Sequence, residues 1–403
     1  MGSSHSWAPL GLADPGYAQI ALRGAAFEGL HGPVDDSGRV WVGAATTVLR
    51  LHALLARVGR SLANLGSISA QTVAGLTATG THGTGRLHPC LSAAVSGVRL
   101  VTMAGERREY TNEAHPVEMG YLRLSLGCLG VITGLRIQTV PLFYIAERQF
   151  TLPVQEGPAA LQELVQGERD SGLRHRFSWF PHGRRTRVQA FAAVAPPAVL
   201  PEPFDRLGFA QRLEGKLLGE WLFAALLGVC GRFPALTPGI FRLADRLHFK
   251  NWAEPRTGRM FERINEHGIP RHEETEWAIP IEAAPEAWRA MRLGIQKHGI
   301  PADFLQELRT ARADGIPLSA ARERDVCWVS LYQTTPHRWP ESLAFAADIL
   351  GSLGGRPHWG KAFDPSGIAE RVGPEFQAFE VFRREMDPGG RLLGPWHRRL
   401  GLG

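Results

Sequence analysis

The stretch from Asn64 to Gly85 constrains this chain more than any other part of it. It contains five glycines and five threonines, and no Asp, Glu, Lys or Arg. Glycine lets the backbone approach a ligand closely and adopt positive φ. Hydroxyls and backbone N–H groups are the donors that a phosphate needs where no lysine is supplied. The composition alone favours equally a backbone cradle for a pyrophosphate and an ordinary glycine-rich surface turn. It holds neither a P-loop nor a strand-linked G-x-G-x-x-G motif, so a phosphate site here is of another type.

This stretch, called the Gly/Thr loop below, is similar to the flavin loop of one family of FAD-linked oxidases. The matching elements are G-S-I at 66–68, Q-T-V-A-G at 71–75 and A-T-G-T-H-G-T at 78–84. Three further segments match in the same order: GSSHSW at 2–7, QELRT at 306–310 and RPHWGK at 356–361. With four matching segments over nearly its whole length, the chain resembles the aldonolactone and alditol oxidases, such as D-arabinono-1,4-lactone oxidase and L-gulonolactone oxidase. These enzymes have the vanillyl-alcohol-oxidase, or PCMH-type FAD-binding, fold.

The resemblance implies an α+β fold in three parts. Residues 1–145 are expected to form the FAD-binding domain, and 146–354 a substrate domain with a mostly antiparallel sheet and flanking helices. Residues 355–403 are expected to return to the FAD domain. The family places one more βαβ-like segment before the histidine loop at 2–7, so the sequence is expected to begin inside the FAD domain. A start codon assigned too far downstream is one explanation, and a truncated, non-catalytic remnant is the alternative.

The resemblance also implies the cofactor contacts. His5 falls where the family bonds a histidine covalently to the flavin 8α-methyl group, and Ser4 stands where the family usually has glycine. Thr72 is also a candidate for a hydrogen bond to substrate. The other expected FAD contacts are Ser6, Gly66, Ser67, Gln71, Thr72, Gly75, Thr79, Gly80, Thr81, His82 and Gly83, with Gly130, Val131 and Ile132 at the adenine and ribose end.

The chemistry of an alcohol oxidation indicates further residues. Glu307 and Arg309 are two apart, so on a strand both point to one face, where the carboxylate fixes the guanidinium. Taken alone, such a pair is usually a solvated salt bridge. The resemblance places this pair above the flavin ring. It implies that Arg309 binds the substrate oxygen, while Glu307 orients Arg309 and binds a sugar hydroxyl.

The segment 356–361 contributes two more candidates. Lys361 is expected to be a second cation for the alkoxide, and a proton acceptor if burial and Arg309 depress its pKa. His358 is the competing base. We predict no metal site, because no group of His, Cys and carboxylates has metal-ligand spacing. The acidic pair Glu273–Glu274 beside His272 is interpreted as a solvated face. The predicted reaction is oxidation of a CH–OH group of a sugar-derived lactone or polyol, with electrons passing to O2 or another acceptor.

The composition excludes other classes of protein. Charged residues make up 21% and hydrophobic residues 44%, as in a globular chain. The net charge of +6 comes without a Lys/Arg run, so we expect no nucleic-acid partner. Four widely spaced cysteines predict buried free thiols and a cytoplasmic location. The apolar run Leu217–Cys230 is too short to cross a bilayer. It predicts a buried helix, with membrane-surface association as the alternative.

Hydrophobic periodicity predicts the main elements. A strand is expected over 39–43, followed by a helix capped by Thr46 or Thr47. The apolar face of that helix should be Leu51, Leu54, Leu55 and Val58. Further strands are expected near 98–102, 135–139 and 276–280. Further helices are expected over 117–126, 207–230, 239–247 and 283–298 and near 376–382, with a proline-rich loop at 194–205.

Overall fold

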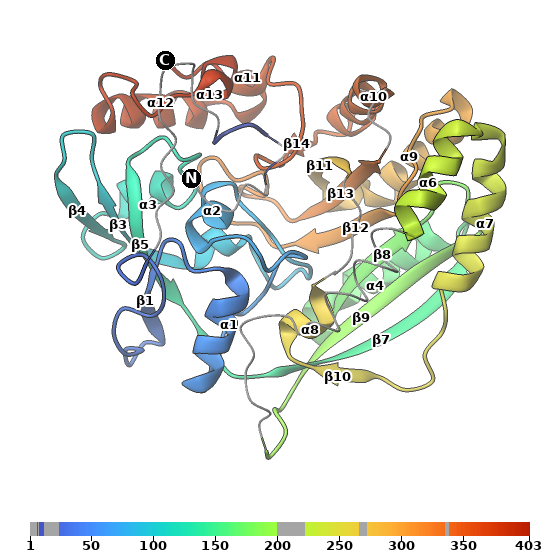
Figure 1. Ribbon diagram of the computed structural model, residues 1–403, viewed down its shortest axis with the longest axis horizontal. Helices are drawn as coiled ribbons and strands as arrows, with labels where there is room; N and C mark the ends of the chain where they lie inside the picture. The colour runs from blue at the N-terminus through green and yellow to red at the C-terminus, as the bar shows by residue number, and fades with distance from the viewer. Residues whose placement is uncertain (1–5, 7, 12–23, 200–221, 266–271, 335–337) are drawn as a thin grey trace.

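The computed structural model describes residues 6, 8–11, 24–199, 222–265, 272–334 and 338–403 (Figure 1). Within these ranges, a four-stranded and an eight-stranded antiparallel sheet dominate the fold. Helices cover both sheets, so the fold class is α+β as predicted. The predicted covalent-flavin residue His5 and its neighbour Ser4 lie outside the described residues.

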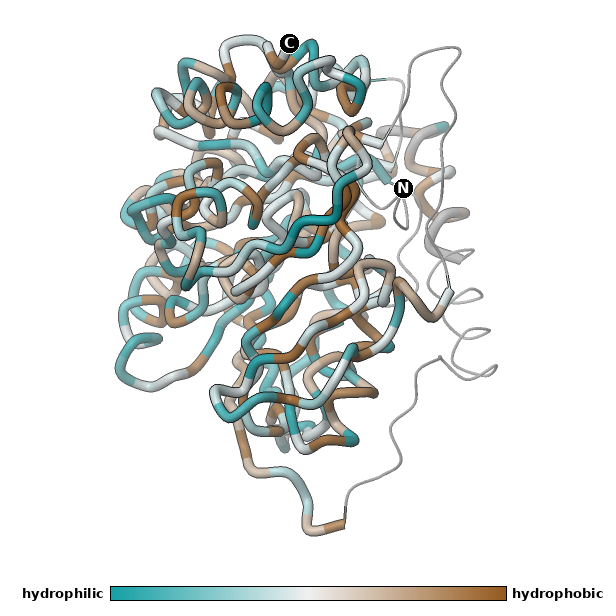
Figure 2. Tube along the Cα trace, turned by 90° about the vertical axis from the view of Figure 1, so that its left-hand side faces the viewer, coloured by the Kyte–Doolittle hydropathy of each residue, from teal (hydrophilic) through white to brown (hydrophobic). Residues whose placement is uncertain are grey.

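The four-stranded sheet belongs to the first part of the chain. Its spatial order is β1 (Arg39–Gly43), β5 (Val131–Gln138), β3 (Val95–Val101) and β4 (Arg107–Thr111). A two-residue pair, β2 (Arg60–Ser61) with β6 (Val140–Pro141), closes this part. Hydrophobic and hydrophilic residues alternate along the chain traces on this side of the molecule (Figure 2). This alternation is what strands with one buried face require.

Helix α1 (Val48–Arg57) begins where the sequence predicts. The Thr47 side chain accepts a hydrogen bond from the Arg50 backbone N–H and caps the helix. Leu51 and Leu55 are buried, but Val58 is 51% exposed, so its place on the predicted apolar face is wrong. Val58 is already the C-cap residue, with a non-helical φ of −106°, and therefore leaves the helix face. Helix α3 (Pro116–Leu122) is likewise shorter than predicted.

The eight-stranded sheet lies across the centre and right of Figure 1. Its spatial order is β10 (Arg256–Gly258), β7 (Tyr144–Pro153), β9 (Arg185–Val194), β8 (Arg174–Trp179), β12 (Gln306–Ala311), β13 (Val326–Gln333), β11 (Glu273–Pro280) and β14 (Arg356–Pro357). Helices α4 (Gly157–Ser171), α9 (Ala284–His298) and α10 (Trp339–Ser352) pack against it. Leu308 of β12 lies on the helix-covered face, in a core that includes Trp288 of α9.

The register of this sheet collects polar side chains on its other face. Glu307 of β12 pairs with Ser330 of β13, and Arg309 pairs with Trp328. On the far side of β13, Glu276 of β11 is also opposite Ser330. Because alternate residues of a strand point to opposite faces, these side chains project together away from the helices. The candidate site lies on this polar face.

The C-terminal helices contact the first part of the chain. Helices α11 (Ile368–Val372), α12 (Pro374–Met386) and α13 (Pro395–Arg399) lie along the top of Figure 1. The Tyr121 ring of α3 stacks on Phe382 of α12, with centroids 5.3 Å apart. His397 of α13 hydrogen-bonds to the Leu126 carbonyl through Nε2, at 2.9 Å. The positions of the predicted domain limits remain predictions.

Two helices stand at the right-hand edge of Figure 1, α6 (Leu222–Arg232) and α7 (Thr237–His248). The first part of the apolar run 217–230, and residues 200–205 of the proline-rich loop, lie outside the described residues. Within α6, Leu227 and Cys230 are buried while Val229 is exposed. In the described parts of the chain, no helix combines the length and apolar character needed to span a membrane.

Candidate active site

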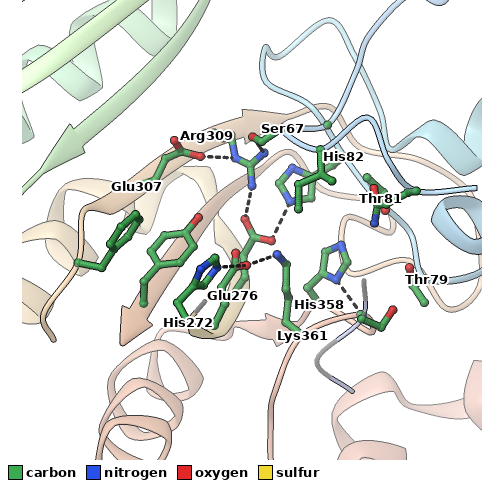
Figure 3. Close-up of a pocket in the computed structure, with 18 of the residues that line it drawn as sticks. Ser67, Thr79, Thr81, His82, His272, Glu276, Glu307, Arg309, His358 and Lys361 are labelled. Atoms are coloured by element: carbon green, nitrogen blue, oxygen red, sulfur yellow. Dashed lines mark hydrogen bonds and ion pairs between the residues drawn. The ribbon is translucent and has the colours of Figure 1, made fainter. Parts of the chain in front are cut away.

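A cleft of about 770 Å³ opens between the Gly/Thr loop and the polar face of the large sheet (Figure 3). One wall carries no charge and comes from the first part of the chain: Ser6, Gly66, Ser67, Ile68, Gln71, Thr79, Thr81 and His82. The other wall is rich in ionisable groups: His272, Glu274, Glu276, Phe304, Leu305, Glu307, Arg309, Tyr332, His358, Gly360 and Lys361.

The Gly/Thr loop is held in place at an internal helix cap and at its C-terminal end. Thr72 is the N-cap of α2 (Val73–Ala78), where its hydroxyl accepts a bond from the Gly75 N–H at 3.3 Å. At the far end, the Gly85 N–H donates to the Thr310 carbonyl of β12 at 2.9 Å. Gly85 has φ +110°, a conformation that side-chain-bearing residues rarely adopt. The loop is therefore joined to the strand that carries Arg309.

Arg309 lies at the centre of the charged wall, and three side chains hold its guanidinium. Nη2 donates to Glu276 Oε1 at 2.7 Å, and Nε lies 3.0 Å from Glu307 Oε1. Nη1 donates to Ser67 Oγ of the Gly/Thr loop at 3.1 Å. The predicted pairing of Glu307 with Arg309 on one strand face is present. The contact with Ser67 brings this cation directly to the loop.

Two carboxylates that sequence reasoning did not assign to the site belong to it. Glu274 and Glu276 are only 2% and 1% exposed, and both line the cleft. The interpretation of the pair Glu273–Glu274 as a solvated face is therefore wrong for Glu274. The physical reason is the position of β11, which lies between β13 and β14 inside the sheet. The alternation E-T-E at 274–276 was the available signal, because it places two carboxylates on one strand face.

Lys361 and His358 both reach the cleft from the turn after β14. The Lys361 ammonium forms an ion pair with Glu274 Oε2. His358 Nδ1 accepts a hydrogen bond from the Gly360 N–H at 2.9 Å. A neutral imidazole whose Nδ1 accepts must carry its proton on Nε2. His358 therefore presents an N–H donor to the cleft.

His82 is held rigidly against the floor of the site. Its ring stacks on Trp328 of β13, with centroids 3.9 Å apart and planes within 3° of parallel. Nδ1 lies 3.0 Å from the Gly83 carbonyl, and Nε2 lies 3.2 Å from Glu276 Oε2. The loop therefore contributes an ionisable ring that contacts the charged wall. Trp328 was not among the predicted site residues.

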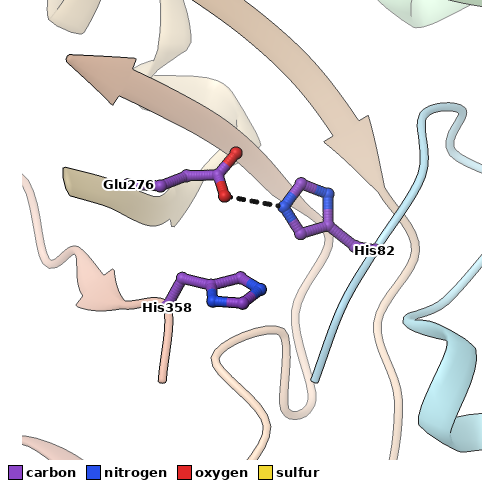
Figure 4. A group of neighbouring side chains, drawn as sticks. All are labelled: His82, Glu276 and His358. Atoms are coloured by element: carbon purple, nitrogen blue, oxygen red, sulfur yellow. Dashed lines mark ion pairs between the residues drawn. The ribbon is translucent and has the colours of Figure 1, made fainter. Parts of the chain in front are cut away.

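One grouping has the shape of a metal site. Single ligand atoms of His82, Glu276 and His358 lie within 4.8 Å of one another (Figure 4). The hydrogen bond from Gly360 decides against this use. With Nδ1 of His358 accepting that bond, the lone pair needed by a metal is on the wrong nitrogen, and Nε2 carries a proton. We therefore interpret the three residues as a proton-bearing cluster.

Burial and neighbouring charges set the ionisation of the cluster. Burial would raise the pKa of the Glu276 carboxyl, but His82 and Arg309 hold that pKa well below its usual range. Burial would also lower the pKa of the Arg309 guanidinium, yet Glu276 and Glu307 outweigh it and the pKa is raised. Burial lowers the pKa of His358 to about 3. At neutral pH the carboxylate of Glu276 and the cation of Arg309 are thus charged, while His358 is neutral.

The carboxylates and cations of the charged wall are equal in number. Three carboxylates, Glu274, Glu276 and Glu307, meet three cations, Lys361, Arg309 and Arg176. The longest of these contacts joins Arg176 Nε and Glu307 Oε2 at 3.5 Å. Buried charges persist only when paired. This wall can therefore stay ionised out of water.

The predicted site residues form two groups, those that line the cleft and those that do not. All four predicted catalytic residues line the cleft, and so do the following predicted cofactor contacts: Ser6, Gly66, Ser67, Gln71, Thr79, Thr81 and His82. The predicted contacts that shape the loop or lie elsewhere are Thr72, Gly75, Gly80, Gly83, Gly130, Val131 and Ile132. Gly130 and its two neighbours stand at the start of β5 in the small sheet. Their predicted contact with adenine remains a prediction.

Two protein families and several known proteins are similar to this chain. A FAD binding domain family matches residues 1–111, and the family described as D-arabinono-1,4-lactone oxidase matches residues 135–400. The L-gulonolactone oxidase of Scyliorhinus torazame is 30% identical over 370 residues, covering 89% of this chain and 80% of that protein. The L-gulono-1,4-lactone dehydrogenase of Mycobacterium tuberculosis is 27% identical over 406 residues, covering 99% and 89%.

Solved structures show the same fold. The crystal structure of cholesterol oxidase from B. sterolicum aligns with a TM-score of 0.76 at 15% identity, covering 100% of this chain and 89% of that one. The fold and the matched domains define a FAD-dependent oxidoreductase of the PCMH type that acts on CH–OH donors. Within that class, the chain belongs to the D-arabinono-1,4-lactone oxidase family.

The residues of the cleft fit an FAD. Its uncharged wall offers hydroxyls and backbone N–H groups, which are the donors a diphosphate accepts. A β-carbon built on Gly66 would come within 2.9 Å of Thr81 Cγ2, so glycine keeps that wall open. On the opposite wall, the Arg309 cation is held in place and suits the electron-rich edge of a flavin ring. The donor set therefore agrees with the matched domain.

Proposed function

We propose that this enzyme oxidises a CH–OH group of a sugar-derived aldonolactone or polyol. When bound, the flavin supplies the acceptor for the hydride that leaves the carbon, and its electrons pass on to O2 or another acceptor. The chain supplies the cleft, two cations and the groups that hold and move the hydroxyl proton. The contact between Arg309 and Ser67 carries this proposal, because it brings the substrate strand and the Gly/Thr loop to one point.

Aldonolactones are the first substrate class to test. The similar proteins named above include an L-gulonolactone oxidase and an L-gulono-1,4-lactone dehydrogenase. The charged wall suits such substrates. Carboxylates at Glu274 and Glu307 accept hydrogen bonds from sugar hydroxyls, and the His358 Nε2–H and the Arg309 guanidinium donate to oxygens. A donor and a cation aimed at the reacting oxygen would stabilise its developing negative charge.

The geometry supports changed roles for two of the predicted catalytic residues. The Lys361 ammonium is engaged in an ion pair with the buried Glu274, so we assign it to charge stabilisation and not to proton removal. His358 presents Nε2–H, so we assign it as a donor to the substrate oxygen. Glu307 keeps its proposed role of orienting Arg309.

We also infer that the flavin is linked covalently through His5. The described residue next to it, Ser6, lines the cleft, which supports placing this segment at the flavin. Acid precipitation of the purified protein is the direct measurement. A yellow pellet in the wild type and a colourless pellet in the variant His5→Ala are expected. A colourless wild-type pellet from yellow protein would mean that the flavin is bound without a covalent bond.

The activity test has two arms, an oxygen electrode and an artificial dye acceptor. L-Gulono-1,4-lactone, D-arabinono-1,4-lactone and linear polyols should be screened, because oxygen reactivity separates an oxidase from a dehydrogenase. Substrate should also bleach the flavin anaerobically. A flavin-loaded protein that no lactone or polyol bleaches would favour the alternative of a non-catalytic remnant. A cytoplasmic location remains a prediction, supported by four buried free cysteines.

Arg309→Lys tests the central cation. Lysine keeps the charge but cannot bond Glu276, Glu307 and Ser67 together, because it lacks the planar fork of arginine. Anaerobic flavin reduction should slow by about 10²–10³-fold, the usual cost of losing a donor to a developing oxyanion. The flavin absorbance should show that cofactor is still bound. An unchanged reduction rate would remove Arg309 from the reaction.

A further inference from the structure

His82 faces two hydrogen-bond acceptors, and a neutral histidine satisfies only one of them. Nδ1 lies 3.0 Å from the Gly83 carbonyl oxygen and Nε2 lies 3.2 Å from Glu276 Oε2. A neutral imidazole carries one proton, so one of its nitrogens must present a lone pair to an oxygen lone pair. This holds for either tautomer. The ring satisfies both contacts only when it holds a second proton.

The Glu276 carboxylate oxygen that faces His82 lacks a hydrogen-bond donor. Its Oε1 accepts from Arg309 Nη2 at 2.7 Å and from Ser330 Oγ at 3.0 Å. Among the described residues, none donates a hydrogen bond to Oε2, which is buried. Buried carboxylate oxygens without donors are rare in folded proteins. One added proton between His82 Nε2 and Glu276 Oε2 would therefore supply the missing hydrogen bond.

The surroundings of the pair favour a resting state without that proton. Burial lowers the pKa of His82, and Glu276 offsets this only in part. The pair shares the cleft with these charged or titratable groups: Arg309 and Glu307 of β12, Tyr332 of β13, Glu274 of β11, His272 just before β11, and His358 and Lys361 after β14. Because the ion pairs of this wall balance, Glu276 rests as a carboxylate beside a neutral His82.

From this geometry we propose that the pair His82–Glu276 is the general base of the enzyme, accepting the hydroxyl proton of the substrate between Nε2 and Oε2. The proposal rests on the oxidoreductase function argued above. The resting neutral ring that this step requires carries its proton on Nδ1, toward the Gly83 carbonyl, and leaves Nε2 with a lone pair. In the step, the O–H bond breaks and its proton moves to Nε2. The C–H hydrogen leaves with two electrons to the flavin, and the C=O bond forms. The contact between two lone pairs becomes a charge-assisted N–H···O bond.

Two further features suit His82 to this role. The parallel stack on Trp328 places an aromatic face against the ring, and such faces attract cations. The other basic groups of the cleft are already engaged. Lys361 is paired with Glu274, and His272 Nε2 lies 3.7 Å from the same Glu274 carboxylate. His358 Nδ1 accepts the Gly360 N–H. The pair is thus a proton acceptor that lines the cleft in the correct protonation state.

The decisive variant is Glu276→Gln. A glutamine amide can donate its N–H to His82 Nε2. The Nε2 lone pair is then occupied and cannot accept the substrate proton. Anaerobic flavin reduction by substrate should fall by about 10²–10⁴-fold, the usual contribution of a general base. In the wild type, kcat/KM should be constant above neutral pH and fall on the acid side as the pair takes up a proton, with an apparent pKa below 6.5. This acid limb should disappear in Glu276→Gln.

A matched control uses the other oxygen of the same carboxylate. Ser330→Ala removes the bond to Oε1 and leaves Oε2 and His82 unchanged. It should keep the acid limb and lose less than about tenfold in rate, consistent with one neutral hydrogen bond. A slow Glu276→Gln enzyme that keeps the acid limb would overturn the proposal, because another group would then be the base.

A second readout does not depend on turnover. Nitrogen-15 NMR of histidine-labelled, flavin-loaded protein reports the protonation of each ring, with His82 assigned from His82→Asn. His82 should be neutral at pH 7, and its titration should move to lower pH in Glu276→Gln but not in Ser330→Ala. A protonated His82 at pH 7, or a titration unmoved in Glu276→Gln, would overturn the proposal. If the NMR result holds while no lactone or polyol reacts, the proposed function fails instead.

Discussion

At the scale of single residues, the ion pair between Lys361 and Glu274 is expected to stabilise the fold, and we propose that its lysine also stabilises charge in the reaction. Glu274 is buried, so Lys361→Met removes the ammonium partner of a buried carboxylate and leaves it with the more distant His272 Nε2, at 3.7 Å. Removing one partner of such a pair costs about 3–5 kcal/mol of unfolding free energy. Flavin reduction should also collapse, because the reacting oxygen loses a cation. Urea unfolding and anaerobic stopped-flow measurements check the two effects separately.

The double variant Lys361→Met/Glu274→Gln separates the two roles. It removes both charges together, so most of the lost stability should return while flavin reduction stays slow. Recovery of both would show that Lys361 acts only on the fold. Recovery of neither would show that the two residues are not coupled as the structure indicates.

At the scale of elements, Glu168 of α4 joins three segments beneath the site. Its Oε2 accepts from Thr310 Oγ at 2.7 Å and from the Arg86 N–H at 2.9 Å. Its Oε1 accepts from the His175 N–H of β8 at 2.9 Å. The carboxylate thus fastens the end of the Gly/Thr loop to the strand of Arg309. Glu168→Gln replaces one acceptor oxygen by an NH2 group and should cost about 2–3 kcal/mol of unfolding free energy.

Glu163→Gln on the same helix is the matched control. Glu163 is exposed, so this change should alter the unfolding free energy by less than about 0.5 kcal/mol. Urea unfolding followed by circular dichroism measures both variants. Equal stabilities would show that the three segments are held together without Glu168.

At the scale of the whole molecule, buried neutral histidines make stability depend on pH. Burial lowers the pKa of His52, which packs against Phe261 of α8 (Met260–Ile264), to about 4. Unfolded histidine has a pKa of about 6.5, so below that pH the unfolded state binds a proton that the folded state does not. The stabilisation is complete above pH 6.5 and is lost as the pH falls toward 4. Between pH 7 and pH 5, His52 should cost the fold about 2 kcal/mol.

His52→Gln isolates this contribution, because it removes one titration away from the cleft. The loss of stability between pH 7 and pH 5 should shrink by about 2 kcal/mol, whatever the change at pH 7. The measurement is the urea midpoint across this pH range. An unchanged pH dependence would mean that His52 takes up its proton in the folded state.

Local sequence patterns determined much of this protein. The composition of residues 64–85 predicts a glycine-rich loop with hydroxyl and N–H donors, because this chemistry acts over a few residues. Helix α2 and its cap at Thr72 appear only in the structure. The spacing of Glu307 and Arg309 predicts one strand face for both, because side chains alternate along any strand. Together with the segment 356–361, these patterns carried the family resemblance that the comparisons confirmed.

The tertiary structure alone decided which charges are buried and which partners they have. The sequence interpretation made Glu274 a solvated acid and placed Glu276 only at the start of a strand, but β13 and β14 pair on either side of that strand and both carboxylates are buried. His82 becomes a candidate base only because β13 brings Trp328 beneath it and β11 brings Glu276 to Nε2. Ionisation depends on burial and on charges within a few ångströms, and these neighbours lie far away along the chain. A sequence pattern of short range does not contain that information.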